Sequence, residues 1–444
     1  MWPLAISGVQ RCPARLIGTR TIEGRQPWEA HMRDGIVIVG AGQAGARAAE
    51  ELRKQGYAEA IRLIGSEPHL PYERPHLSKE YMLGREEIEA IFIHDERWYA
   101  EHSVELIQDT VVNADLSAKT VSMGTGARLA FESLLLTTGS EPRRLAVPGA
   151  ELSGVLYLRT IEDARRIRIS LEAGGRSVVI VGGGWIGLEL AAAARTLGND
   201  VTVMDAGDVV LGRALGPEAG GYFARAHRAH GVQLLMGEQL AGLEGAEGSV
   251  VGAVTASGRR LPLDVLIVGI GALPRTAVAE SAALPVDNGI VVDAALRTGH
   301  PSVYAAGDVA NAYHPLFERH IRVEHWDTAR MMSRAAARSM VGQSVSYDRI
   351  PYFYTDQYDI SMEYWGSVGR AGFDQFVWRG DPDDGSALGF WLQSGHVRAG
   401  MSINIPKMGK LIEALVRSNE SIDVEALVDV DQSLESMLPA AESA

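Results

Sequence analysis

Short apolar runs that end in glycine-rich turns recur along the chain. The first run, Gly35 to Val39, is rich in β-branched residues and does not alternate with polar ones, which is typical of a strand buried on both faces. It is followed by the turn Gly40–Gly45, an alanine-rich segment to about Lys54, and a second apolar run from Ala60 to Ile64. This order predicts a strand–helix–strand unit with its glycines at the first turn.

The same plan recurs in the middle of the chain. The run Ser177 to Val181 leads into the turn Gly182–Gly187, then into a helical segment, and then into a strand from Val201 to Met204. A second pair of segments is also similar: LLLTTGSEPR from Leu134 and LIVGIGALPR from Leu266 both pass from an apolar strand through a glycine turn to a Pro-Arg pair. Two independent matches predict two related nucleotide-binding units.

Three glycines in each turn have the spacing of a dinucleotide-binding loop. The first permits the tight turn, the second lets the backbone approach a pyrophosphate, and the third lets the helix pack close to the strand, while the helix N-terminus offers free N–H groups. These positions are Gly40, Gly42 and Gly45 in the first turn, and Gly182, Gly184 and Gly187 in the second. We therefore expect two dinucleotide sites.

An acidic residue after the next strand is expected to hold the ribose hydroxyls of each dinucleotide. Asp205 directly follows the run Val201 to Met204, and Glu67 is the candidate in the first unit. A carboxylate at Asp205 would repel a 2′-phosphate, which favours NADH over NADPH. Two dinucleotide sites in one chain indicate FAD plus NAD(P)H, with NADPH the less expected of the two, because a hydride donor and a flavin acceptor must be held close together.

The composition shifts near Ile350, where aromatic residues become frequent. Short β-like runs there are interrupted by a turn-rich segment, and a helix and an acidic end that we expect to fray follow. The runs are 360–366, 375–379, 387–393 and 397–405, the turn is 381–385, the helix is about 408–417, and the acidic end is 431–444. This pattern predicts a small α+β domain, and its aromatic residues between Tyr352 and Trp365 are expected to be mainly core.

We therefore predict an α/β fold with two Rossmann-like dinucleotide-binding domains, the NAD domain inserted in the FAD domain, plus a C-terminal α+β interface domain. Residues 1–33 are expected to be an extension, either disordered or upstream of a true start at Met32. The predicted segments are 34–145 and 271–348 for the FAD domain, 146–270 for the NAD domain, and 349–444 for the interface domain.

Composition and charge narrow the function. The net charge of −14 argues against a nucleic-acid surface, and no apolar run approaches the roughly 18 residues of a membrane span, so a soluble protein is expected. The single cysteine, Cys12, excludes a redox-active cysteine pair within the chain and favours a reducing, cytoplasmic setting. No metal site is expected. A local basic patch for an acidic partner is possible, although solvent-facing helix positions are the ordinary expectation for its arginines, Arg159, Arg165, Arg166 and Arg168, or Arg225 and Arg228.

Several longer strings resemble one known family. The segment EPHLPYERPHLSK (67–79) resembles a motif of the FAD-dependent ferredoxin reductases that serve Rieske oxygenases and cytochromes P450, a putidaredoxin and rubredoxin reductase-like family within the glutathione-reductase-like flavoproteins. VYAAGD (303–308), RVEHW (322–326) and PYFYTDQYD (351–359) are similar to this family too. The resemblance covers about 35–439.

The resemblance implies roles for individual residues. Lys79 would lie near flavin N5 and pair with Glu189, so that a fixed cation stabilises negative charge as the flavin is reduced. Trp326 would pack near the flavin ring, and these three residues are the predicted catalytic group. The predicted FAD contacts are Gly40, Gly42, Gly45, Glu67, Arg74, Lys79, Val112, Thr138, Gly139, Gly307, Asp308, Glu324 and Trp326. The predicted NAD contacts are Gly182, Gly184, Ile186, Gly187, Asp205, Arg213 and Gly271.

Two positions depart from the family pattern. His76 replaces a proline, so the loop that carries Lys79 is expected to be looser. Trp185 stands where relatives often have Tyr or Phe, and its ring would stack where the nicotinamide enters the site.

The expected function is that of an FAD-dependent NADH:ferredoxin oxidoreductase. Hydride passes from NADH to FAD, and single electrons pass to a [2Fe–2S] ferredoxin or a rubredoxin that serves an oxygenase. The protein is expected to be a monomer or a homodimer. Two alternatives stay open: an apoptosis-inducing-factor-like flavoprotein with an NADH-responsive binding role, and a reductase of quinones or peroxides. Fast NADH-dependent reduction of a one-electron acceptor would favour the first function.

Overall fold

The computed structural model describes residues 35–368 and 372–439. A first sheet contains five strands in the order β19-β7-β1-β2-β3, and every neighbouring pair is parallel. The strands are β1 (Ile36–Val39), β2 (Ile61–Gly65), β3 (Val104–Gln108), β7 (Ser133–Leu136) and β19 (Val303–Ala305). Strand β1 is buried at all four positions and β7 at the last three of its four, as the apolar runs predicted.

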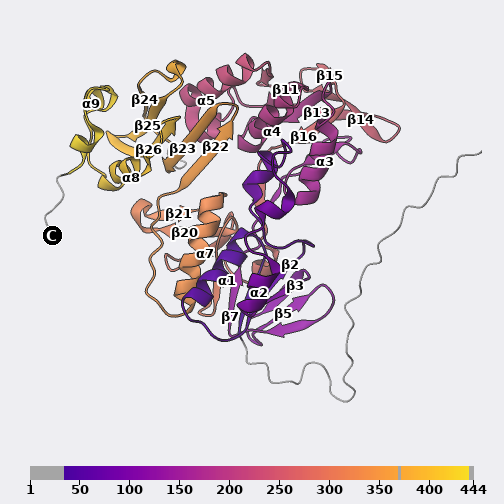
Figure 1. The fold of residues 1–444 in the computed structure, drawn as a ribbon, viewed down its shortest axis with the longest axis vertical. Coiled ribbons are helices and arrows are strands. Elements are labelled where there is room, and N and C mark those ends of the chain that lie inside the picture. Colours follow the sequence, from indigo (N-terminus) through magenta and orange to yellow (C-terminus); the bar gives the residue numbers. More distant parts are fainter. Residues whose placement is uncertain (1–34, 369–371, 440–444) are drawn as a thin grey trace, which may run out of the picture. The chain divides into compact units, whose positions relative to one another are not determined.

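Helices from distant parts of the chain cover this sheet. Helix α1 (Gln43–Lys54) and helix α7 (Trp326–Met340) pack side by side, and Figure 1 shows the indigo and orange ribbons in contact. Apolar residues of both helices, among them Leu52 and Met332, join the sheet in one core. The first sheet therefore takes four strands from residues 36–136 and one strand from residues 303–305, and the second sheet lies between them in the sequence.

A second parallel sheet is formed by that middle segment. Its strands have the order β12-β11-β10-β16-β9, and its helices include α4, which follows the second glycine turn. The strands are β9 (Val155–Tyr157), β10 (Ser177–Val181), β11 (Asp200–Asp205), β12 (Gln233–Met236) and β16 (Val265–Val268). The helices are α3 (Ile161–Leu171), α4 (Trp185–Thr196) and α5 (Gly212–Ala229).

The two segments that resemble each other in sequence also touch each other. Strand β8 (Ser140–Pro142) follows β7 of the first sheet, and strand β17 (Ala272–Pro274) follows β16 of the second. The two strands pair antiparallel. They lie where the chain passes into the second sheet and out of it. The chain thus crosses between the sheets through a two-stranded connection.

The aromatic-rich region forms an antiparallel sheet, in the order β22-β23-β26-β25-β24. Its members are β22 (Tyr352–Gln357), β23 (Ile360–Gly366), β24 (Gln375–Arg379), β25 (Ala387–Gln393) and β26 (His396–Ile403), with α8 (Gly409–Ser418) and α9 (Val424–Val428). The predicted runs match three strands to the residue, and the small α+β arrangement is confirmed. Apolar side chains of α8, including Ile412 and Leu415, pack in the core of this region.

Smaller elements complete the described part of the chain. One three-stranded sheet contains β4 (Val111–Asp115), β5 (Thr120–Met123) and β6 (Arg128–Ala130), and a second contains β13 (Leu240–Ala246), β14 (Ser249–Thr255) and β15 (Arg260–Pro262). A third contains β18 (Ile290–Val292), β20 (Ala310–His314) and β21 (Arg319–Ile321), and the short helices are α2 (Glu96–Glu101) and α6 (Ala277–Ser281). Within the described ranges, no helix combines the length and apolar character needed to cross a membrane.

Candidate functional site

One cavity of 490 Å³ is lined by residues of both glycine turns. The 3-10 turn Arg74–Ser78, the start of α7 and strand β22 complete its wall. Large concave sites with a few convergent polar groups are the usual places for cofactors and substrates. The predicted site residues that line it are Gly40, Gly42, Glu67, Arg74, Lys79, Thr138, Gly139, Asp308, Glu324 and Trp326, together with Gly184, Ile186, Glu189 and Gly271.

The first glycine turn is fixed by the protein's own backbone at two positions. A Cβ on Gly40 would lie 2.2 Å from the carbonyl oxygen of Thr137, and φ at Gly40 is +116°. A Cβ on Gly45 would lie 2.1 Å from the carbonyl oxygen of Gly40, so only glycine lets α1 pack this close to β1. Gly42 differs, because a Cβ there would meet no protein atom within 4 Å. The free space at Gly42 is on the cavity side, where a ligand can approach the backbone.

The second turn repeats this construction. A Cβ on Gly182 would lie 2.3 Å from the carbonyl oxygen of Gly269, and one on Gly187 would lie 2.0 Å from that of Gly182. At Gly184 the nearest such atom is 4.0 Å away. Neither Gly42 nor Gly184 caps its helix with a side chain, so the first N–H groups of α1 and α4 stay available for an anion.

Asp205 ends strand β11 beside the second turn. Its carboxylate accepts the backbone N–H groups of Gly183 and Gly207, each at 2.7 Å. Two backbone donors hold the carboxylate in one orientation at the end of the strand. This is the position at which the sequence predicted an acid for ribose hydroxyls.

Lys79 and Glu189 form an ion pair in the cavity wall. Lys79 Nζ lies 2.7 Å from Glu189 Oε1, and the two side chains are 10% and 4% exposed. Glu189 also accepts the hydroxyl groups of Ser78 at 2.5 Å and Thr355 at 2.7 Å. A pair at this depth is not the weak surface contact that a Lys–Glu pair usually is, because leaving either charge buried alone is costly.

Glu67 lies in the cavity wall with partners that the sequence did not indicate. One of its carboxylate oxygens accepts Arg74 Nη2 at 2.5 Å, and the other accepts the Tyr72 hydroxyl at 2.6 Å. Arg74 also donates to the Tyr72 hydroxyl and to the carbonyl oxygen of Arg159. Glu67 therefore fixes Arg74 in place, and only its remaining lone pairs are available to a ribose.

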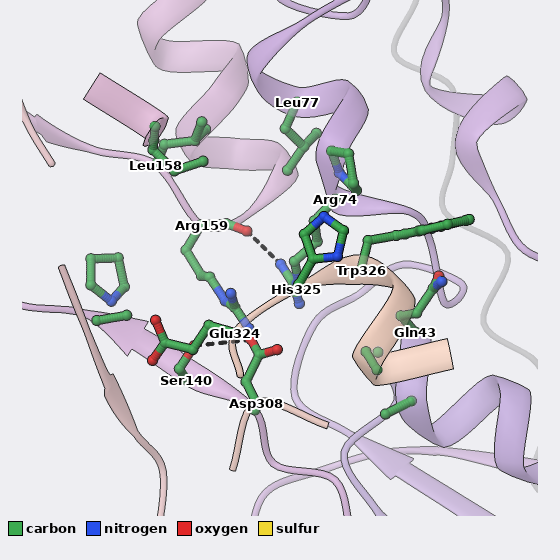
Figure 2. A pocket seen from close by; sticks show the side chains of 18 of the residues that line it. Gln43, Arg74, Leu77, Ser140, Leu158, Arg159, Asp308, Glu324, His325 and Trp326 are labelled. Atoms are coloured by element: carbon green, nitrogen blue, oxygen red, sulfur yellow. Dashed lines mark hydrogen bonds and ion pairs between the residues drawn. The ribbon is translucent and has the colours of Figure 1, made fainter. Parts of the chain in front are cut away.

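Asp308 contacts Arg159, a second arginine of the cavity wall beside Arg74. Its carboxylate accepts the Ser140 hydroxyl at 3.0 Å and Arg159 Nη2 at 3.2 Å, as Figure 2 shows. Burial, together with the nearby charge of Arg74, lowers the pKa of Arg159. The expectation that Arg159 coats a solvent-facing helix is wrong, since this residue precedes α3 and lines the cavity.

Some buried polar atoms at the cavity have no hydrogen-bond partner in the protein, which bears on whether a dinucleotide fits there. Both amide atoms of Gln43 are buried without a hydrogen-bond partner, and so is Trp326 Nε1. Figure 2 shows both residues at the cavity. Buried polar groups in proteins are almost always satisfied, so these atoms indicate a bound group with its own donors and acceptors. With the open space at Gly42, they fit a dinucleotide.

Aromatic and histidine side chains complete the cavity wall. Trp185, whose ring was expected near the nicotinamide, lines the cavity, and its ring lies 4.3 Å from that of Phe353. Phe353 and Tyr354 of β22 were not predicted at the site. These two aromatic residues are therefore wall residues, whereas Trp365 is core as expected. His325 precedes α7, and burial lowers the pKa of its imidazole to about 4. The family strings at 322–326 and 351–359 were the available signal for this wall.

The remaining predicted residues lie outside the cavity lining. The side chain of Val112 is 54% exposed, because β4 turns the neighbouring Val111 and Ala114 inward. Arg213 is exposed on the first turn of α5. Four predicted glycines are buried outside the cavity lining. Gly45, Gly182 and Gly187 belong to the two glycine turns, and Gly307, with φ +80°, precedes Asp308. Asp205 lies beside the second turn as described above.

The fold and site define an oxidoreductase of the dinucleotide-binding class. Residues 34–333 match the pyridine nucleotide-disulphide oxidoreductase family, and residues 352–438 match the reductase C-terminal family. The first family binds FAD and NAD(P), which is consistent with the two glycine turns.

Similar proteins narrow this class. Rhodocoxin reductase of Rhodococcus erythropolis is 36% identical over 90% of this chain and 93% of its own. The ferredoxin–NAD(+) reductase component of the anthranilate 1,2-dioxygenase system of Burkholderia cepacia is 38% identical over 91% and 99%. The structure of a covalent putidaredoxin reductase–putidaredoxin complex is 32% identical, with a TM-score of 0.88 over 93% of this chain and 100% of that one. The chain belongs to the ferredoxin reductases of the pyridine nucleotide-disulphide oxidoreductase family.

Proposed function

We propose that the chain is an FAD-dependent NADH:ferredoxin oxidoreductase. The observation that carries this proposal is that both glycine turns line the same cavity, because two dinucleotides bound at these turns would have their reactive rings in one space. Bound FAD would supply the redox chemistry, accepting a hydride and releasing its electrons one at a time. The protein's part is to hold, orient and shield the reacting groups.

The first turn would hold FAD. The N-terminus of α1 behind Gly42 offers N–H groups to the pyrophosphate, and the Gln43 amide gains a partner. Trp326 would lie against the ring, and Lys79, fixed by Glu189, would place a positive charge where negative charge develops. Further contacts would come from Arg74, Thr138, Gly139, Asp308 and Glu324.

The second turn would hold NADH. Gly184 leaves room for the pyrophosphate, and Ile186 and Gly271 line the cavity beside it. The carboxylate of Asp205 would accept ribose hydroxyls and repel the 2′-phosphate of NADPH, which supports the preference for NADH. Arg213 would lie at the same end of the site.

The strand composition of the two sheets supports the predicted domain boundaries. We infer an FAD domain from residues 34–145 and 271–348, since the first sheet takes strands from both, and an inserted NAD domain from residues 146–270. Residues 349–444 would form the interface domain. The single cysteine supports a cytoplasmic setting.

The proposed partner is a small iron–sulfur protein, either a [2Fe–2S] ferredoxin or a rubredoxin that serves an oxygenase. The support is the set of relatives, which includes a rubredoxin–NAD(+) reductase of Pseudomonas putida and a dioxygenase reductase component. The test is NADH-dependent cytochrome c reduction with and without a [2Fe–2S] ferredoxin from the same source, repeated with NADPH. A large ferredoxin-dependent rise with NADH is expected. Bleaching of the flavin without a ferredoxin effect would favour a signalling or small-molecule role instead.

A further inference from the structure

A chain of buried hydrogen bonds connects Glu189 to a histidine on helix α5. The Thr355 hydroxyl donates to Glu189 Oε1 at 2.7 Å, and Gln357 Nε2 donates to Thr355 Oγ1 at 3.1 Å. Gln357 Oε1 lies 2.8 Å from His227 Nε2. The exposures of Thr355, Gln357 and His227 are 0%, 2% and 0%, so water does not compete for these groups.

The carboxylate at one end dictates the direction of every bond. An ionised carboxylate only accepts, so the single hydroxyl proton of Thr355 must point to Glu189. Thr355 Oγ1 therefore accepts from Gln357, whose amide NH₂ must face it and whose carbonyl must face His227. His227 must then donate through Nε2–H. All donors in the chain point toward Glu189, and aligned hydrogen bonds of this kind strengthen one another.

The far end of the chain agrees with this direction. Burial lowers the pKa of His227 to about 4, so its imidazole is neutral near pH 7 and, with Nε2 protonated, its Nδ1 is an acceptor. The Tyr358 hydroxyl lies 3.2 Å from Nδ1 and can donate to it. On its other side the Tyr358 ring stacks on His230 at 3.7 Å, and His230 is exposed. The chain thus runs from near the surface of α5 to the cavity wall.

We propose that His227 is a positioning residue for the Lys79–Glu189 pair and acts on it through Gln357 and Thr355. The oriented chain holds Glu189 as a carboxylate with Oε1 toward Lys79, and so holds Lys79 Nζ in the cavity wall. The residues involved come from α4, α5, β22 and the loop after the 3-10 turn Arg74–Ser78, so the chain ties these elements together at the site. This inference rests on the proposed role of Lys79 and Glu189 beside the flavin.

The first test measures the tautomer of His227 and needs no turnover. Nitrogen-15 histidine labelling of the FAD-loaded protein, with the His227→Gln variant for assignment, distinguishes Nε2–H from Nδ1–H imidazole. A neutral Nε2–H form with a slowly exchanging proton is expected, and Thr355→Val should change its shift. An Nδ1–H form or a charged imidazole at pH 7 would overturn the proposal.

The second test measures the pH profile of flavin reduction by saturating NADH. Ser78, Thr355 and the Tyr354 ring face the Lys79–Glu189 pair, so a change in this chain of hydrogen bonds should appear as a shift of the acid-side midpoint of the profile. Thr355→Val removes one hydroxyl donor to the carboxylate and should raise this midpoint by about one pH unit, the size expected for a hydrogen bond to a charged group. Thr355→Ser keeps the hydroxyl and should retain the wild-type profile.

Variants of the two histidines of α5 complete the second test. His227→Leu should shift the midpoint in the same direction as Thr355→Val, and His227→Gln, which keeps an N–H donor, should restore it. His230→Gln is the matched control, since His230 stacks on the same tyrosine but donates nothing to the chain, and its profile should be that of the wild type. Thr355→Val changes so little volume that it decides the question even if His227→Leu fails to fold.

Lys79→Met separates this inference from the proposed function. It should slow flavin reduction by about tenfold or more, because the fixed positive charge is lost. Suppose that Lys79→Met reduces flavin slowly, but Thr355→Val and His227→Leu keep the wild-type pH profile. This result would overturn the positioning role of His227 and leave the role of Lys79 intact. A Lys79→Met protein as fast as the wild type would overturn both the role of the ion pair and this inference.

Discussion

The two glycine turns share a backbone design and differ in the side chains that they present. In both turns the first and third glycines are required by backbone atoms about 2 Å from a would-be Cβ, and the middle glycine faces open space. After the middle glycine, however, the first turn presents a buried Gln43 and the second presents Trp185 and an exposed Ile186. The first turn is thus suited to an enclosed group that stays bound, and the second to a ligand that exchanges.

The acidic residues beside the two turns, Glu67 and Asp205, differ in how many of their lone pairs other protein groups occupy. Both oxygens of Glu67 are engaged by side chains of its own loop, Arg74 and Tyr72. Asp205 is held only by two backbone N–H groups, so its outer lone pairs remain free for a ligand that binds and leaves. We therefore expect the repeated backbone to bind a dinucleotide at each turn, and the side chains of each turn to determine how long that dinucleotide stays bound.

The shared part of the design gives the largest expected effect. Gly40→Ala and Gly182→Ala each place a methyl group 2.2–2.3 Å from a carbonyl oxygen at a residue with positive φ. Each should lower the free energy of unfolding by about 3 kcal/mol or more, or prevent folding. Urea denaturation checks this, and wild-type stability in either variant would contradict the steric account of the turns.

The middle glycines should separate the two turns. Gly42→Ala and Gly184→Ala have no protein atom closer than 4.0 Å to the new methyl group, so stability without ligand should be nearly unchanged. Gly42→Ala should reduce the FAD content of the purified protein, whereas Gly184→Ala should keep FAD and raise the dissociation constant of NADH roughly tenfold. Flavin absorbance and NADH titration give the two values. Equal loss of flavin in both variants would show that the turns are not specialised.

The acid of the second turn sharpens the comparison further. Asp205→Asn removes the negative charge near the ribose and should reduce the preference for NADH over NADPH by about tenfold, mainly by improving NADPH binding. Asp208→Asn is a matched control, because Asp208 is an exposed acid three residues along the same loop. The ratio of kcat/KM for the two nucleotides is the measurement. If both variants change the ratio equally, general charge near the site explains the preference.

The sequence predicted what local patterns determine. Continuous apolar runs located β1 and β10, and the glycine spacing located both turns, because buried strands and tight turns are built from neighbouring residues. The link from Thr355 to His227 and the contact of Arg159 with Asp308 could not be predicted. They join residues far apart in the chain, and no periodicity encodes which side chains meet across elements.

Val112 shows a second limit of the sequence. Its FAD contact stays a prediction from the family resemblance. The resemblance did not give the direction of its side chain, which depends on the register of β4, and the side chain of Val112 points outward. The loop that carries Lys79 was expected to be looser because His76 replaces a proline. The structure instead gives His76 a partner, since Nδ1 lies 2.7 Å from Glu86 and Nε2 lies 3.8 Å from Glu73.

The histidine at position 76, which replaces the family's proline, gives the smallest expected effect. The second glycine turn has no corresponding prediction. The carboxylates of Glu73 and Glu86 raise the pKa of His76 above its ordinary value of 6.5. The charged imidazole therefore stabilises the fold fully below pH 6.5, and this contribution is lost as the pH rises through the raised pKa. His76→Gln should be less stable than the wild type at pH 6, by less than about 1 kcal/mol because the group is partly exposed, and equal to it near pH 9.

Urea denaturation of the FAD-loaded proteins at both pH values measures the difference for His76. Glu86→Gln and Glu73→Gln should each remove part of the pH dependence, because both carboxylates raise the pKa of His76. A stability gap that widens from pH 6 to pH 9 would mean that neutral His76 is the form that supports the loop. The loop that carries Lys79 would then be held by packing, as the glycines of both turns are, and not by the charge of His76.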